Sequence, residues 1–188
     1  RRLIIELPNF VSGDTCKLLR ERIAFQKDSD QATMNMYSRD GLTVDISKDK
    51  KLKDVDAKLL SIFNEVQKRV VQQRYKPSCA SADSGYEYHK YGPGMICHHH
   101  IDGEFSQAEK DGSLLRYASV ILHLNTVDEG GELIFPSYNK KIKTEEGKIV
   151  IFPPTGSYGH YTSPSKKERE VIVTWFVYSG IVIKETRS

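Results

Sequence analysis

The chain has 188 residues, 28 Lys and Arg against 25 Asp and Glu, and a net charge of +3, and 38% of its residues are hydrophobic. This length and composition predict one globular domain with a single sizeable core. The uninterrupted apolar stretches are far shorter than the ~18 residues of a membrane-spanning helix, which argues against a membrane partner. The small, scattered positive charge argues against a nucleic-acid partner.

The three cysteines, Cys16, Cys79 and Cys97, fit no metal-binding spacing. Their odd number predicts free thiols, which are typical of a reducing compartment. No signal-peptide pattern follows Arg1, so a cytoplasmic location is favoured. The sequence does not indicate an oligomeric state.

In the first half of the chain the pattern predicts a short strand at residues 3–7 and then two helices. Ser12 is a candidate N-cap for a helix that continues to about Phe25. From residue 54 to about residue 75, apolar residues recur at steps of three and four, and Pro77 follows. This periodicity predicts the strongest helix of the chain, with an apolar face that backs a sheet.

Beyond residue 84 the helical period disappears, and segments rich in Tyr, Val, Ile and Phe alternate with turn residues. Strands are predicted near residues 85–91, 95–101, 115–124, 132–135, 148–152, 157–162, 168–178 and 181–184. Short strands after two helices predict a mainly β fold with supporting helices, either a barrel or a jelly roll. We expect one domain over residues 1–188, with residues 1–84 as helical support and 85–188 as the β core.

Six histidines are present, and three of them are consecutive and followed by Ile101 and Asp102. Alternate residues of a strand share a face, so His98, His100 and Asp102 are expected to point the same way. A histidine and a carboxylate at this spacing can hold adjacent positions on one metal ion. Taken alone, the pattern is weak evidence for a site.

His160 adds a third candidate ligand, and the cation Arg169 follows it. Two imidazoles and one carboxylate occupy one face of an octahedral Fe(II) and leave three positions open. A 2-oxo acid can fill two of these positions and dioxygen the third, with Arg169 pairing with the far carboxylate of the acid. On the strand at 168–178, Trp175 shares the face of Arg169.

Five segments, in order, resemble the prolyl-hydroxylase branch of the Fe(II)/2-oxoglutarate-dependent dioxygenases. They are YGPGMICHHHID at 91–102, RYASVILHLN at 116–125, GGELIFP at 130–136, GKIVIF at 147–152, and the stretch from His160 to Trp175. The resemblance covers residues 86–178 and implies a double-stranded β-helix, which is a jelly roll.

By this resemblance, His100, Asp102 and His160 match the iron ligands, and Arg169 matches the residue that pairs with the distal carboxylate of 2-oxoglutarate. Trp175, six residues after Arg169, matches a Trp present in both the oxygen-sensing and the collagen-type prolyl hydroxylases, and it is expected to contact the co-substrate. The resemblance implies hydroxylation of a prolyl residue in a protein or peptide, with Fe(II), 2-oxoglutarate and O2, release of succinate and CO2, and ascorbate as a further factor. The Arg, where collagen-type enzymes usually have a Lys one position later, is more similar to the oxygen-sensing prolyl hydroxylases.

The chain also departs from the family pattern. Cys97 stands where the family often has a Tyr, Leu133 replaces the Thr of a G-G-E-T block, and His123 replaces a Tyr. Polar contacts to 2-oxoglutarate are therefore expected from His123, Tyr91 and Ser119, although His123 fits a core histidine equally well.

Other interpretations of the same residues remain open. A cupin-type metalloprotein would use His98, His100, Glu104 and His160 as ligands, and it would give Arg169 no role. Relatives with the same core act on lysyl residues or small molecules, and a binding module without catalysis is a further alternative. Polar, glycine-containing loops at 29–46 and 103–113 are candidates for a lid over the substrate.

Overall fold

The computed structural model describes residues 3–24, 32–34, 40–71, 81–103 and 115–178. The strands are β1 (Ile5–Leu7), β2 (Ala32–Met34), β3 (Leu42–Asp45), β4 (Ser81–Asp83), β5 (Glu87–Tyr91), β6 (Leu115–His123), β7 (Leu133–Phe135), β8 (Lys140–Ile142), β9 (Ile149–Phe152), β10 (Tyr161–Thr162) and β11 (Arg169–Tyr178). The helices are α1 (Gly13–Ala24) and α2 (Lys53–Val66), and α2 continues as one π-helical stretch, Gln67–Val71. Within these ranges, no helix has both the length and the apolar character needed to cross a membrane.

Two antiparallel sheets form the β part of the molecule. The larger sheet has the strand order β1-β9-β6-β11-β5-β3-β2, and β4 also pairs with β11. The smaller sheet has the order β10-β7-β8. Side chains of the two sheets meet in one apolar cluster that includes Ile121, Val173 and Phe135. This arrangement of two facing sheets is the predicted jelly roll with supporting helices.

Strand β11 lies at the centre of the larger sheet, between β5 and β6, and all its residues except Tyr178 are buried. One face, with Val171 and Val173, is directed to the smaller sheet, and the other, with Ile172 and Phe176, is directed to the helices. Burial of both faces explains why this segment is a nearly continuous apolar run rather than an alternating one.

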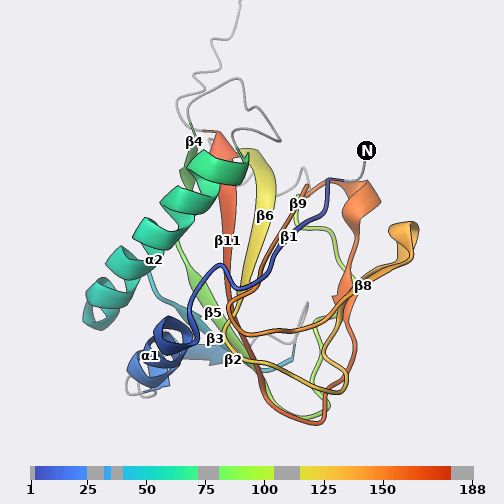
Figure 1. Ribbon diagram of the computed structural model, residues 1–188, viewed down its shortest axis with the longest axis horizontal. Coiled ribbons are helices and arrows are strands. Elements are labelled where there is room, and N and C mark those ends of the chain that lie inside the picture. The colour runs from blue at the N-terminus through green and yellow to red at the C-terminus, as the bar shows by residue number, and fades with distance from the viewer. Residues whose placement is uncertain (1–2, 25–31, 35–39, 72–80, 104–114, 179–188) are drawn as a thin grey trace, which may run out of the picture.

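Both helices cover the outer face of the larger sheet, on the side opposite β8 (Figure 1). The Ser12 hydroxyl accepts a hydrogen bond from the backbone N–H of Thr15 at 3.3 Å, which confirms the predicted N-cap of α1. The apolar stripe of α2 is buried as predicted, and Phe63 stacks on Tyr86 with ring centroids 5.3 Å apart. A second apolar core therefore lies between the helices and the larger sheet, and it packs against the outer face of β11.

The structure differs from the sequence-based expectations in several places. Strand β8 was not predicted, and the strand predicted at 157–162 is a strand only over β10, because its first part lies in the 3-10 helix Gly156–Tyr158. The strands β2, β3 and β4 lie in the part expected to be helical support, and they extend the larger sheet. Part of the expected lid at 29–46 is therefore sheet, because β3 pairs with β5. The predicted strand at 95–101 is irregular, with a single bridge between His100 and His160. The expected strand at 181–184, most of the loop at 103–113 and the rest of the loop at 29–46 outside 32–34 and 40–46 are beyond the described residues.

Candidate metal centre

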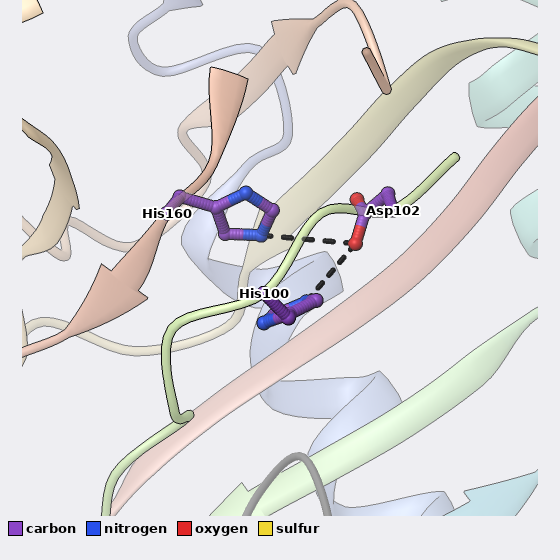
Figure 2. A group of neighbouring side chains, drawn as sticks. All are labelled: His100, Asp102 and His160. Carbon is purple, nitrogen blue, oxygen red and sulfur yellow. Dashed lines mark ion pairs between the residues drawn. The ribbon is translucent and has the colours of Figure 1, made fainter. Parts of the chain in front are cut away.

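His100, Asp102 and His160 come together as the sequence predicts (Figure 2). One ligand atom of each lies within 4.8 Å of the others. The carboxylate Oδ1 of Asp102 lies 3.0 Å from Nε2 of His100 and 3.8 Å from Nε2 of His160. Within the described part of the chain, these residues form the one cluster of His, Cys, Asp and Glu with this geometry.

The backbone and the two Nδ1 atoms fix the orientation of both imidazoles. His100 and His160 exchange a pair of backbone hydrogen bonds of 3.1 and 3.0 Å. Nδ1 of His100 lies 2.7 Å from the carbonyl oxygen of His98, and Nδ1 of His160 lies 3.0 Å from that of Tyr158. When each ring is neutral, a proton on Nδ1 therefore leaves Nε2 with a free lone pair, as metal-binding histidines require.

The three side chains also shift each other's pKa. Although burial opposes it, the two imidazoles hold the pKa of Asp102 well below its ordinary value. Burial also opposes the charged form of His100, but hydrogen bonds to Asp102 and Cys97 raise its pKa to about 10. Burial lowers the pKa of His160. The metal-free cluster thus holds a proton between His100 and Asp102, at the position that a cation would occupy.

His98 does not join this cluster, contrary to the expectation that it shares a face with His100. Its Nε2 lies 3.2 Å from Oδ1 of Asp40, and its side chain is 46% exposed. The reason is that the segment is not a regular strand, so side chains do not alternate along it. The cupin ligand set therefore loses His98, and its other distinctive member, Glu104, lies outside the described residues.

A pocket between the two sheets extends from the three ligands to Arg169. Arg169, Val171, Val173 and Trp175 line it together, which confirms the predicted shared face of β11. The remaining lining residues are His89, Tyr91, Cys97, Ile121, Leu133 and Thr162 together with the three ligands. A polar ligand set at one place and a cation at another, with an apolar wall between them, suits a small dicarboxylic acid.

Arg169 is only 3% exposed. Its Nε donates to the hydroxyl of Thr144 at 3.1 Å, and its guanidinium lies 5.3 Å from the ring centre of Tyr91 and within hydrogen-bonding reach of the Tyr91 hydroxyl. Among the described residues no carboxylate forms an ion pair with it, and burial lowers its pKa. A buried guanidinium without an ion-pair partner is costly, and an anionic ligand would offset this cost.

The structure places the remaining predicted contact residues at different distances from the pocket. Tyr91 and Trp175 line it. Ser119 and His123 are fully buried, and neither lines the pocket. Among the described residues, the Ser119 hydroxyl and both ring nitrogens of His123, which lies near Arg169, have no hydrogen-bond partner. Burial and Arg169 lower the pKa of His123 far below the ordinary value, so the ring is neutral.

Two residues near the pocket were missed by the sequence analysis. Thr144 bridges Arg169 and the carbonyl oxygen of Gly131, and Arg116 hydrogen-bonds to the backbone of Asp102. The alternation of side chains along a strand predicts neither contact. Thr144 is in a loop after β8, and Arg116 is next to an irregularity of β6. The Gly130-Gly131 block is the one sequence signal that borders Thr144.

The donor set fits a divalent iron ion. Two neutral Nε2 atoms and one ionised carboxylate on one side of a metal ion are the arrangement of non-haem Fe(II) oxygenases, which leaves positions open for a co-substrate and dioxygen. The fold and this site together define a jelly-roll oxygenase of the His, carboxylate, His type.

The comparisons with known proteins agree with this class. Residues 86–177 match the model of the 2OG-Fe(II) oxygenase superfamily. Fe(II), 2-oxoglutarate and O2 are thus the reactants that the family implies. No curated protein sequence matches the chain.

Solved prolyl hydroxylases share the fold. A viral collagen prolyl hydroxylase from Paramecium Bursaria Chlorella virus-1, in complex with 2OG, superposes with a TM-score of 0.74 at 18% identity over 94% of this chain and 97% of that chain. A Pseudomonas putida prolyl-4-hydroxylase gives 0.70 at 17% identity over 94% and 93%. A Trichoplax adhaerens prolyl hydroxylase in complex with a hypoxia inducible factor peptide fragment gives 0.67 at 15% over 92% and 82%. These likenesses confirm the double-stranded β-helix.

Proposed function

We propose that this oxygenase hydroxylates a prolyl residue in a protein or peptide, with 2-oxoglutarate as co-substrate. One observation carries the proposal: a single pocket contains a His, carboxylate, His cluster and a buried guanidinium that forms no ion pair with any described residue. Because 2-oxoglutarate has a chelating 2-oxo acid group and a distal carboxylate, it complements both features.

In this proposal His100, Asp102 and His160 hold Fe(II). Arg169 pairs with the distal carboxylate, oriented by the hydrogen bond from its Nε to Thr144. Bound Fe(II) would allow O2 to oxidise both molecules, so that one oxygen atom enters the succinate formed from 2-oxoglutarate with loss of CO2, and the other enters the prolyl C–H bond as a hydroxyl group.

Two further side chains, Tyr91 and Trp175, line the proposed co-substrate site, whereas His123 and Ser119 are buried outside its lining. Tyr91 contributes its hydroxyl and ring beside Arg169. Trp175 forms an apolar wall of the pocket, which limits the access of water to the reacting groups.

The prolyl substrate is proposed from the fold likeness. The three solved structures compared above are prolyl hydroxylases, and one of them is in complex with a peptide. We also propose a reducing compartment such as the cytoplasm, because Cys16 and Cys97 are buried free thiols. Ascorbate is proposed as the reductant that keeps the iron in the Fe(II) state.

The test is succinate formation from 2-oxoglutarate, with Fe(II) added under anaerobic conditions and air admitted afterwards. A panel of proline-containing peptides is compared with matched peptides in which alanine or lysine replaces the proline, and each assay is run with and without ascorbate. Turnover that a proline peptide stimulates and that Asp102→Ala abolishes supports the proposal. Stimulation by lysine peptides alone would reassign the substrate, and no consumption of 2-oxoglutarate with metal bound would contradict the activity.

A further inference from the structure

A β-bulge turns the Arg116 side chain toward the inner face of the larger sheet. Ser119 pairs with Trp175 and Ala118 with Phe176, but the next paired residues are Arg116 and Val177, so Tyr117 has no partner on β11. Regular alternation from Ser119 would put Tyr117 on the inner face and Arg116 on the outer one. Instead, Tyr117 packs in the core beneath the helices, near Phe176. Bulges beside active sites commonly redirect a side chain in this way.

The redirected guanidinium contacts both the Asp102 backbone and the Trp175 ring, beside the metal centre. Nη1 of Arg116 donates to the backbone carbonyl oxygen of Asp102 at 2.7 Å. Its Cζ lies 3.9 Å from the centre of the Trp175 ring, which is a close cation–π distance. Trp175 thus holds the planar group over the ring while the hydrogen bond reaches the metal ligand.

The peptide group after Asp102 is held at both of its polar atoms. Arg116 binds the Asp102 carbonyl oxygen, and the N–H of Gly103 donates to the carbonyl oxygen of Pro154 at 2.8 Å. Asp102 does not belong to a strand, so no sheet ladder fixes its backbone. The direction of its carboxylate toward the two Nε2 atoms depends on these two hydrogen bonds.

We propose that Arg116 is a positioning residue of the metal centre, which sets the orientation of the Asp102 carboxylate by holding its backbone carbonyl while stacked on Trp175. This inference rests on the metal centre of the proposed function. Arg116 does not itself contact the metal ion. A hydrogen bond that orients a metal ligand typically changes metal affinity by about 10–100-fold when it is removed.

The test measures metal binding without turnover. Co(II) and Mn(II) affinities of the metal-free protein are determined by calorimetry, and the Co(II) absorption spectrum is recorded for the wild type, Arg116→Leu, Arg116→Lys and Asp102→Ala. Arg22→Leu is the matched control, because Arg22 pairs with Asp54 on the helical side. The melting temperature of each metal-free variant separates a loss of folding from a loss of binding.

We expect Arg116→Leu to weaken Co(II) binding about 10–100-fold and to change the Co(II) spectrum, with the control unchanged. We expect Arg116→Lys to recover part of the affinity, because an ammonium group can donate to the same carbonyl oxygen but lacks the flat stacking surface. If Arg116→Leu does not fold, Arg116→Lys is measured in its place. Wild-type Co(II) affinity together with a wild-type Co(II) spectrum in the measured variant would overturn the role of Arg116.

The two levels of the proposal fail differently. If the wild type binds no Co(II), the metal centre is refuted, and the role of Arg116 with it. The same holds if Asp102→Ala binds Co(II) as tightly as the wild type does. Specific Co(II) binding that Asp102→Ala abolishes and Arg116→Leu leaves intact would refute the role of Arg116 alone.

Discussion

The backbones of His100 and His160 are joined by a reciprocal pair of hydrogen bonds, N–H of each to the carbonyl oxygen of the other, at 3.1 and 3.0 Å. The bridge puts the two rings beside each other, with centroids 4.4 Å apart. The bridge thereby joins the segment that follows β5 to the residue that precedes β10. The metal site is therefore built by a contact between two distant segments and not by one sequence motif.

The first prediction separates the ligand histidine from its exposed neighbour. His100→Ala should remove detectable Co(II) binding, whereas His98→Ala should leave the affinity unchanged within about threefold, because His98 pairs with Asp40 outside the cluster. Calorimetry on both metal-free variants decides it. Loss of binding in His98→Ala alone would favour the cupin ligand set.

The second prediction concerns the buried guanidinium. Arg169→Met should abolish binding of 2-oxoglutarate but stabilise the metal-free protein, because it removes a buried charge that has no ion-pair partner among the described residues. Replacing buried ions with apolar side chains of similar size is often stabilising by about 1–4 kcal/mol. Chemical unfolding and the fluorescence of the chain's one tryptophan, Trp175, provide the two measurements.

Arg169→Lys serves as the control for that experiment. It keeps the charge but loses the planar donor group that meets Thr144, so we expect weakened binding of 2-oxoglutarate without the gain in stability. Full 2-oxoglutarate binding by Arg169→Met would contradict the proposed pairing.

The third prediction is a pH dependence of stability that arises from His123. Burial lowers its pKa well below the ordinary 6.5, so below pH 6.5 the unfolded chain binds a proton that the folded protein does not. The free energy of unfolding must therefore fall as the pH drops below 6.5, by up to about 1.4 kcal/mol for each pH unit from this one group.

Comparison with His123→Gln isolates that contribution, because the other titrating groups are common to both proteins. Denaturant unfolding of the metal-free proteins between pH 7 and pH 5 should show a steeper decline for the wild type. Parallel curves would mean that His123 is protonated in the folded state.

The fourth prediction uses two glycines that both have a positive φ. A Cβ at Gly130, where φ is 76°, would overlap the backbone carbonyl oxygen of Pro164, whereas a Cβ at Gly94, where φ is 79°, would meet nothing within 4 Å. Gly94→Ala should cost about 1–2 kcal/mol of stability from φ alone. Gly130→Ala should cost clearly more, because backbone must also move, and equal melting temperatures would contradict the clash.

The sequence by itself predicted most of the elements of the fold and the residues of the candidate metal centre. It predicted the two helices, most of the long strands and the shared face of Arg169 and Trp175, because these features follow from local periodicity. It also predicted that His100, Asp102 and His160 come together, since residue types and order that suit a metal ion can be recognised without the fold. The strands β2, β3 and β4 were missed because they are short and are stabilised by pairing with distant strands rather than by their own pattern.

Only the tertiary structure decided which side chains meet. His98 turns away from the site because the segment that contains it is irregular and Asp40 lies near it. Arg116 faces inward because the pairing of β6 with β11 shifts at a bulge, which the sequence of β6 alone does not show. Thr144 reaches Arg169 from a loop. Each contact depends on long-range packing and register, whereas local sequence fixes only which face a regular element presents.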